Sequence, residues 1–274
     1  MSFAPRSLLR PLFKLLMLLL VAVLSLQLYF VGRIALMAVL APESTSFQRS
    51  EIWRLVNTTG SLQWRQDWLP YAQISVHLKR AVIASEDASF NEHDGLDLEA
   101  LEKAWSKNAA AEERAKKLAD RYAADAAKRQ SRQKTSSATA APAPPKVVPK
   151  APKIIGGSTI TQQLAKNLFL SGERTLLRKG QELVLTLLLE AMLDKQRILE
   201  IYLNNVEWGG GIFGAEAAAQ HYFRKPAARL SPYEAARLAV MLPRPRYFET
   251  RPNSEYLASR ANTIVARMSG VVVP

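Results

Sequence analysis

The feature that most constrains this chain is a long apolar run near its N-terminus. Residues 12–40 are almost continuously apolar, broken only by Lys14, Gln27 and Arg33, and residues 15–32 are 18 positions without a charge. A helix needs roughly 20 such residues to cross the hydrocarbon core of a bilayer. The run therefore predicts one membrane-spanning helix within residues 1–40, and a separate domain in residues 41–274.

The charges that flank this run predict its orientation. Arg6, Arg10 and Lys14 precede the uncharged positions, and an excess of basic residues keeps that end of a helix in the cytoplasm. A cleaved signal peptide is the alternative, but its apolar region is usually about 7–15 residues long. No clear cleavage site follows, although residues 38–41 leave that alternative open. We expect an uncleaved anchor with a cytoplasmic N-terminus.

Composition excludes several classes of protein. The chain has no cysteine, which excludes disulfides and thiolate metal sites, and its three histidines are isolated from one another. Of the formal net charge of +13, residues 107–153 hold +8, with 12 Lys and Arg against 4 Asp and Glu. An anionic membrane surface explains this local excess as well as a nucleic acid does. We expect no nucleic-acid partner.

Helical periodicity dominates the rest of the chain. No stretch alternates as a strand would, so the fold class is predicted to be mainly α. Residues 69–88 read as a helix, and residues 183–193 are apolar nearly all round, which predicts a buried core helix. Residues 98–133 favour a polar helix without an apolar stripe. Residues 107–153 are interpreted as a mobile, low-complexity basic insertion rich in Ala, Lys and Pro, with no catalytic role.

An acidic cluster lies where the helix over residues 69–88 should end. The sequence there is SEDASFNEHDG, residues 85–95. A carboxylate at such a break can be partly desolvated, which raises its pKa into the range that suits a general base. A solvated acidic loop is the alternative, and composition alone slightly favours it.

The stretch from residue 154 to residue 182 combines a helix start with many polar groups. Thr159 and Gln162 form a capping-box pattern, which predicts a helix beginning at Ser158 or Thr159, and Gly172 suits its C-terminal cap. A second helix should follow. The polar and charged residues of the two helices are Ser158, Thr161, Gln162, Gln163, Lys166, Arg174, Arg178, Lys179 and Glu182.

Two interpretations of this stretch remain open on the sequence. A helix N-terminus with four cations and one carboxylate suits a sugar that bears a phosphate or a pyrophosphate. Alternatively, the charges form a solvated face, and Arg178 with Glu182 is an ordinary surface ion pair at i,i+4 spacing. The stretch alone favours the second interpretation.

Together, five ordered blocks identify a family. They are EDASFNEHDG (residues 86–95), GGSTITQQLAKN (156–167), RKGQE (178–182), KQRILEIYLN (195–204) and EAARLAVMLP (234–243). In this order they resemble glycosyltransferase family 51, the peptidoglycan glycosyltransferases. One membrane anchor with no penicillin-binding domain resembles the monofunctional members in particular.

The resemblance implies a fold, a reaction and a location. The fold would be a lysozyme-like, mainly helical domain that faces the periplasm behind a single helix in the inner membrane. The reaction would polymerise lipid II into β-1,4-linked glycan. The 4-hydroxyl of GlcNAc in lipid II would attack C1 of the terminal MurNAc of the growing strand. Undecaprenyl pyrophosphate would leave, and the anomeric centre would invert.

The resemblance also implies residue roles. Glu86 would be the general base, and Glu182 would assist the leaving group directly or through a divalent Mg²⁺ or Mn²⁺ ion. Pyrophosphate would be held by Lys166, Arg174, Arg178 and Lys179. The remaining substrate contacts would come from Asp87, Phe90, His93, Ser158, Thr161, Gln162, Gln163, Asn167, Lys195 and Asn204.

No organic cofactor is implied. The partners would be lipid II, the growing glycan strand, membrane lipids and other proteins of wall synthesis or division. One departure from the family is the insertion over residues 107–153, which lies between the first two blocks. Two alternatives are a lytic glycosidase on the same fold and a non-catalytic scaffold for wall synthesis. A hydrolase has no need of four clustered cations, and the two glutamates argue against a scaffold without catalysis.

Overall fold

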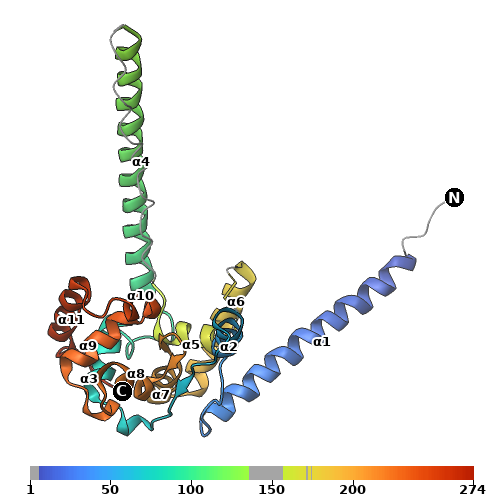
Figure 1. Ribbon diagram of the computed structural model, residues 1–274. Helices are drawn as coiled ribbons and strands as arrows, with labels where there is room; N and C mark the ends of the chain where they lie inside the picture. Colours follow the sequence, from blue (N-terminus) through green and yellow to red (C-terminus); the bar gives the residue numbers. More distant parts are fainter. Residues whose placement is uncertain (1–5, 136–156, 171, 174) are drawn as a thin grey trace. The chain divides into compact units, whose positions relative to one another are not determined.

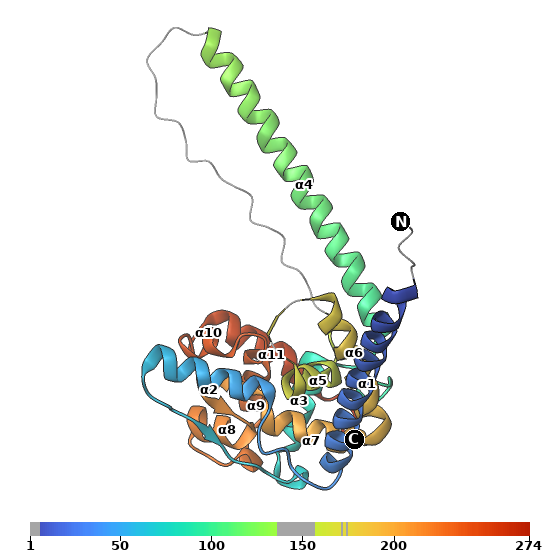
Figure 2. The same cartoon turned by 90° about the vertical axis from the view of Figure 1, so that its right-hand side faces the viewer.

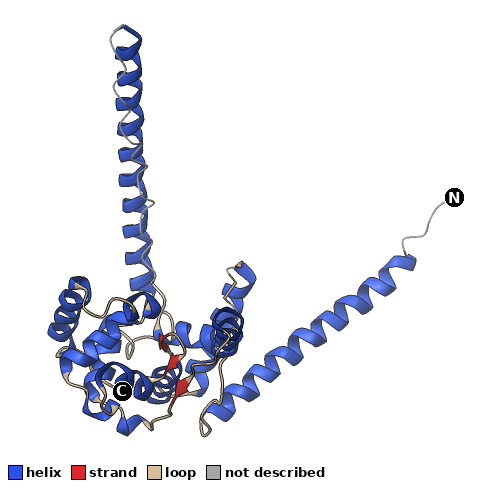
Figure 3. Cartoon of the chain, in the orientation of Figure 1, coloured by secondary structure: helices blue, strands red, loops and turns tan. Residues whose placement is uncertain are grey.

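The computed structural model describes residues 6–135, 157–170, 172–173 and 175–274, and these are mainly helical, as predicted (Figures 1 and 3). The α-helices are α1 (Arg6–Met37), α2 (Ser46–Thr59), α3 (Val76–Glu86), α4 (Leu98–Thr135), α5 (Ile160–Phe169), α6 (Leu176–Met192), α7 (Lys195–Asn205), α8 (Ala215–Phe223), α9 (Pro232–Met241), α10 (Pro245–Glu249) and α11 (Glu255–Met268). Two short 3₁₀ helices cover Tyr71–Gln73 and Ala227–Arg229, and the strands are β1 (Arg65–Gln66), β2 (Glu207–Gly209) and β3 (Ile212–Phe213).

The chain divides into two compact units. The first runs up to Leu96 and resumes at Thr159, and the second is Asp97–Ser158. The second unit is therefore wider than the insertion predicted over residues 107–153. Its described part is dominated by α4, which confirms the helix predicted over residues 98–133. Residues 136–156, which include much of the predicted linker, lie outside the described residues.

The exposure of helix α4 agrees with the polar helix without an apolar stripe that the sequence predicts. Its large side chains Leu101, Trp105, Leu118 and Tyr122 are 45–75% exposed, whereas Ala104 is buried.

Helix α1 contains the predicted membrane-length segment. Residues Arg10–Met37 form 28 helical residues that are long and apolar enough to cross a membrane. The N-terminal half extends away from the other helices of this unit (Figure 1), and its leucines are exposed. The C-terminal end is buried at Phe30, Ile34 and Met37, and the Phe30 ring meets Phe169 of α5 edge-on with centroids 5.3 Å apart.

Polar contacts attach α1 to the helical domain. The side-chain amides of Gln27 and Gln181 exchange hydrogen bonds of 3.0 and 3.2 Å, which link α1 to α6. Arg197 of α7 donates to the backbone oxygens of Met37 and Leu40 at 2.7 and 2.8 Å. These are carbonyls at or just beyond the end of α1 that no further helical turn could satisfy. The C-terminal part of α1 and the residues just after it are therefore bonded to α6 and α7.

The core of the first unit is built from two groups of helices. Helix α3 packs against α9 and α11, while α5 packs against α6 and α7 (Figure 2). The largest fully buried side chains include Trp208, Tyr202 and Phe90. The first sequence block begins at the C-terminal end of α3, and the second block contains the start of α5. The two blocks therefore meet where the two groups of helices adjoin.

The helix predicted over residues 69–88 is shorter than expected. A 3₁₀ turn occupies Tyr71–Gln73, and α3 begins only after Ser75, whose hydroxyl accepts a hydrogen bond from the His77 amide at 3.2 Å. Pro70 precedes this turn and supplies no amide proton for a longer helix. The C-terminal end agrees with the prediction, because α3 ends at Glu86 in the acidic cluster.

The structure also contains a small sheet that the sequence did not predict. Its order is β1-β3-β2, with β1 parallel and β2 antiparallel to β3. The strands are the red segments in Figure 3. Each strand has two or three residues. Alternation of apolar and polar residues cannot be recognised over so short a length.

The prediction for the central helices needs two corrections. Helix α5 ends at Phe169 with Leu170 as its C-cap, so Gly172 is not the cap. Residues 183–193 are not a separate buried helix, because most of them continue α6 from Leu176. Leu183, Val184 and Leu187 are 40–48% exposed, and Leu176 is 93% exposed. Only one side of α6 packs into the domain, so its apolar outer side is left uncovered in the described part of the chain.

Candidate active site

The start of α5 provides the framework of the site. Thr159 is the N-cap: its hydroxyl accepts from the Gln162 amide at 3.2 Å, and the Gln162 side chain accepts from the Thr159 amide at 3.2 Å. This confirms the predicted capping box. The Thr159 hydroxyl also donates to the Gly95 carbonyl at 2.7 Å. The cap thus binds α5 to the loop that follows the acidic end of α3.

Asp87 connects the same two segments. One carboxylate oxygen accepts from the Ile160 amide at 2.9 Å, and the other lies 2.8 Å from His93 Nε2. The first contact places a negative charge at the N-terminus of α5, where the helix dipole favours it. His93 Nδ1 accepts from the Gly95 amide at 3.1 Å, so the neutral Nε2–H tautomer satisfies both contacts.

Glu86 is the carboxylate of the site whose surroundings suit a general base. It is the last residue of α3, and it accepts a hydrogen bond of 3.0 Å from the side-chain amide of Gln163. Burial raises the pKa of Glu86, and hydrogen bonds from Gln163 and Ser85 offset part of that effect. A carboxyl group with a raised pKa is a stronger base once it is deprotonated, as a general base requires.

Tyr202 orients the amide that contacts Glu86. Its hydroxyl donates to the Gln163 side-chain oxygen at 2.9 Å, so the Gln163 amide nitrogen must face Glu86. Burial, together with the charges of Glu86 and Asp87, raises the pKa of Tyr202 well above its usual value. The hydroxyl therefore stays protonated and acts as a donor.

Glu190 forms a second polar centre beneath the loop. It accepts from the Thr161 hydroxyl at 2.6 Å and pairs with Lys195 Nζ at 2.8 Å. Lys195 Nζ also donates to the His93 carbonyl at 2.6 Å and lies 4.7 Å from the centre of the Phe90 ring. Lys195 is therefore engaged within the protein on several sides.

Glu182 is buried beneath two cations. It is 4% exposed, and Arg178 donates to one carboxylate oxygen at 2.9 Å while Lys179 contacts the other. The i,i+4 spacing thus does bring Arg178 and Glu182 together, but the pair is not an ordinary surface ion pair, because the Glu182 side chain is buried. A divalent metal would have to displace a cation from an oxygen already in use. The donor set at Glu182 does not fit a metal ion.

The predicted cations differ in their surroundings. Lys166 is exposed and the Lys179 side chain is 53% exposed, whereas the Arg178 side chain is 17% exposed. Arg178 Nε is buried without a hydrogen-bond partner among the described residues. Arg174 lies outside the described residues, and Ser158 belongs to the second unit.

The sequence-predicted residues of the first unit fall into two layers. The layer that reaches solvent comprises Glu86, Gln162, Gln163, Lys166, Asn167, Arg178 and Lys179. The layer beneath it comprises Asp87, Phe90, His93, Thr161, Glu182, Lys195 and Asn204, whose side chains are buried or held by other protein groups. The lower layer can therefore hold the side chains of the upper layer in position.

Asn204 illustrates the lower layer. It is fully buried, its side-chain nitrogen donates to the Leu69 and Glu200 carbonyls at 2.9 Å, and its oxygen accepts from the Leu69 amide at 2.8 Å. All of these partners are backbone groups. Asn204 therefore holds the segment before α3 rather than a ligand, which differs from the substrate contact expected from the resemblance. Phe90, at 0% exposure, differs from it in the same way.

Two residues of the site were not singled out from the sequence. Glu190 is the one acid within the apolar run LVLTLLLEAML, and a lone charge in such a run signals a buried partner. Tyr202 enters the sequence analysis only as one residue of the block KQRILEIYLN. Its hydroxyl function depends on Gln163, which is 39 positions away.

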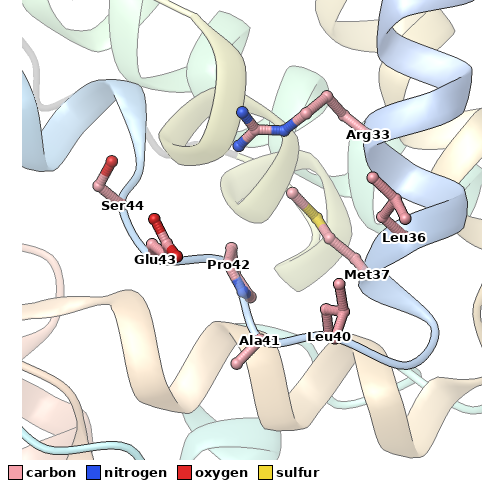
Figure 4. Close-up of a pocket in the computed structure, with 8 residues that line it drawn as sticks. All are labelled: Arg33, Leu36, Met37, Leu40, Ala41, Pro42, Glu43 and Ser44. Carbon is pink, nitrogen blue, oxygen red and sulfur yellow. The ribbon is translucent and has the colours of Figure 1, made fainter.

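A pocket of about 270 Å³ lies elsewhere, where the chain leaves α1. Arg33, Met37, Pro42 and Glu43 are among its lining residues, all of which fall in residues 33–44 (Figure 4). It shares no residue with the cluster around Glu86. The site described above is thus defined by its hydrogen-bonded carboxylates and cations, and not by this pocket.

Comparison with known proteins supports the resemblance to glycosyltransferase family 51. The chain matches the family described as Transglycosylase over residues 54–119 and 138–269. It is 47% identical over 251 residues to a biosynthetic peptidoglycan transglycosylase of Burkholderia thailandensis, covering 92% of this chain and 83% of the relative. A protein of the same description from Herminiimonas arsenicoxydans is 45% identical over 263 residues, covering 96% and 97%. Since the family match spans Glu86, Glu182 and the cations of the site, the resemblance of the five blocks is confirmed, and the chain belongs to the transglycosylase family, glycosyltransferase family 51.

Proposed function

We propose that this chain polymerises lipid II by direct displacement at an anomeric carbon, with Glu86 as the general base. The observation that carries the proposal is the environment of Glu86. It is a desolvated carboxylate held by Gln163 at the start of α5, and α5 also carries the exposed Lys166. Helix α6, which packs against α5, supplies Arg178 and Lys179.

The first half of the reaction needs a proton acceptor. Glu86 would take the proton of the attacking GlcNAc 4-hydroxyl while the oxygen of that hydroxyl forms a bond to C1 of MurNAc. Gln163 would hold the carboxylate in place during this step, because Tyr202 prevents its amide from turning over. Positioned proton transfer of this kind contributes about 10²–10⁴-fold to a rate.

The second half needs stabilisation of a leaving anion. As the bond from C1 to the pyrophosphate oxygen breaks, its electron pair goes to that oxygen, and negative charge grows on the undecaprenyl pyrophosphate. Among the described residues, Lys166, Arg178 and Lys179 would neutralise it. Glu182 would act by holding Arg178 and Lys179, to which both its oxygens are bonded.

The proposed location follows from α1. With the N-terminus in the cytoplasm, the catalytic unit would lie on the periplasmic face of the inner membrane, where lipid II and other wall-synthesis proteins would meet it. The chain has no cysteine, so single cysteines can report the topology. Asn253→Cys should react with a membrane-impermeant maleimide added outside spheroplasts, and Ser2→Cys should react only after lysis. The opposite pattern would overturn the orientation.

The central test is polymerisation of labelled lipid II by the purified full chain. We expect the wild type to make long strands that lysozyme degrades, and Glu86→Gln to lower the rate at least about 100-fold. The matched control is Glu92→Gln, which removes an exposed acid from the same cluster and should keep the wild-type rate.

Two results would contradict the proposal. Polymerisation by Glu86→Gln at the wild-type rate would refute the role of Glu86 as base. Shortening of added glycan without new polymer would show that the chain is a lytic glycosidase, which is the alternative chemistry on a lysozyme-like fold.

A further inference from the structure

Glu190 occupies an unusual position for an acid. It lies on α6 with its side chain 7% exposed, and neither the displacement at C1 nor the neutralisation of the leaving group requires it. A buried carboxylate without partners would be costly, so its bonds account for its presence. These bonds lead to three other segments of the site.

The first connection is to α5. The Thr161 hydroxyl donates to Glu190 at 2.6 Å and is itself fully buried. Thr161 lies in the first turn of α5, two residues before Gln163, which contacts Glu86. A shift of this turn would therefore move the Gln163 amide relative to the base.

The second connection runs through Lys195, at the start of α7. Glu190 pairs with Lys195 Nζ at 2.8 Å, and the same nitrogen donates to the His93 carbonyl at 2.6 Å. Lys195 thus transmits the position of Glu190 to the loop that begins at Glu86. Within that loop, His93 in turn binds Asp87 at 2.8 Å.

The third connection is direct packing against the loop. Gly95 has φ +84°, and a Cβ added there would lie 2.9 Å from Glu190 Cγ and 2.6 Å from a methyl carbon of Thr186. The loop backbone therefore rests on Glu190. Glycine is required at this position by both the left-handed backbone and the close approach.

We infer that Glu190 is a positioning residue that fixes the Glu86-bearing loop against the first turn of α5. The inference rests on the proposed function. Glu190 does not touch the reacting atoms: it acts through Thr161 and Lys195. The carboxylate is needed because it must accept from a hydroxyl and pair with an ammonium group at once, and these are two contacts that a neutral amide oxygen makes more weakly.

The kinetic test compares Glu190→Gln with the wild type, with rates normalised to the folded fraction measured by circular dichroism. We expect kcat to fall about 10–100-fold, because small misplacements of catalytic groups cost that much, while KM stays within about twofold. Glu190→Asp keeps the charge and should recover part of the loss. The matched control is Glu234→Gln, which removes the charge from another partly buried Lys–Glu pair, Lys225 with Glu234, and should leave kcat within about twofold.

A double-mutant cycle separates positioning from general destabilisation. If Glu190 acts through Lys195, then Glu190→Gln combined with Lys195→Met should be no slower than the slower single variant. Additive losses, or a normalised kcat of Glu190→Gln within twofold of the wild type, would overturn the inference. Should Glu190→Gln fail to fold, Lys195→Met is decisive, because it removes the group that links Glu190 to the His93 carbonyl: a wild-type kcat in that variant would also overturn the inference.

Hydrogen exchange tests the inference without turnover. Gly95 donates its amide proton to His93, and we expect Glu190→Gln to speed its exchange at least about tenfold, while Glu234→Gln leaves it unchanged. Unchanged protection in Glu190→Gln would refute the positioning role. This measurement also separates the two proposals, since a wild type that makes no polymer would refute the proposed function alone.

Discussion

Glu86 shows at the scale of one residue how function and stability oppose each other. Burial raises its pKa, which means that the folded protein holds the proton more tightly than the unfolded chain does. Stability is therefore lost as pH rises from the ordinary range of a glutamate pKa through the raised pKa of Glu86. The same desolvation is what would make the deprotonated carboxylate an effective base.

This opposition predicts a stability gain in an inactive variant. Glu86→Gln should have a higher Tm than the wild type at pH 8, because the amide carries no charge to desolvate, and the difference should shrink towards pH 4. Thermal unfolding followed by circular dichroism at the two pH values checks this. Exposed Glu92→Gln provides the control, with little change at either pH. A Tm for Glu86→Gln at or below that of the wild type at pH 8 would contradict the argument.

The same desolvation predicts the pH dependence of the reaction. A general base acts only when it is deprotonated, so with Glu86 as the proposed base the acid limb of the rate profile should lie above the ordinary range of a glutamate pKa. Rates measured from pH 4.5 to pH 8 with labelled lipid II would show it. An acid limb at or below that ordinary range would mean that a different group is the base.

At the scale of elements, one ionic cluster joins α2, β2 and α10. Glu51 of α2 and Glu207 of β2 are 4% and 8% exposed, and Arg246 of α10 contacts both, at 2.7 Å in the case of Glu207. Arg54 also pairs with Glu51. Burial raises the pKa of Glu207 even though Arg246 opposes that effect. The three elements are therefore held by one cation between two buried acids.

Removal of that cation should destabilise the domain. In Arg246→Met, Glu207 loses its charged partner, and we expect the free energy of unfolding to fall by about 2 kcal/mol. This is below the roughly 3–5 kcal/mol typical of a broken buried pair, since Glu51 keeps Arg54. Urea denaturation in detergent measures the change. Exposed Arg229→Met should stay within about 0.5 kcal/mol of the wild type, and an equal effect in both variants would argue against the cluster.

At the scale of the whole molecule, the chain combines a family domain with an added segment. The family match leaves out residues 120–137 and resumes beyond them, and the site residues of the first unit lie outside this segment. A chain lacking residues 120–137 should therefore retain at least about half of the wild-type polymerisation rate. The lipid II assay measures this. Complete loss of activity at an unchanged Tm would show that the segment contributes to substrate handling.

Local sequence specified those features that depend on neighbours along the chain. The capping box of Thr159 and Gln162, the end of α3 in the acidic cluster and the membrane-length helix were all predictable, because caps and apolar length act within a few turns. The family and its reaction followed from the order of five short blocks. Helix extents were less predictable where a turn such as Tyr71–Gln73 intervened.

Tertiary packing decided which of those residues can meet a substrate. Composition cannot distinguish Gln163, which reaches solvent, from Thr161 two positions earlier, which is fully buried, since both are polar residues in one helix turn. Nor can it pair Glu190 with Lys195 and Thr161, because burial and contact depend on how α5, α6 and α7 pack. The polar residues of the stretch from residue 154 to residue 182 are thus divided between an exposed layer and a supporting layer. The physical reason is that only a folded chain has an interior, so the sequence alone does not show which side chains are buried.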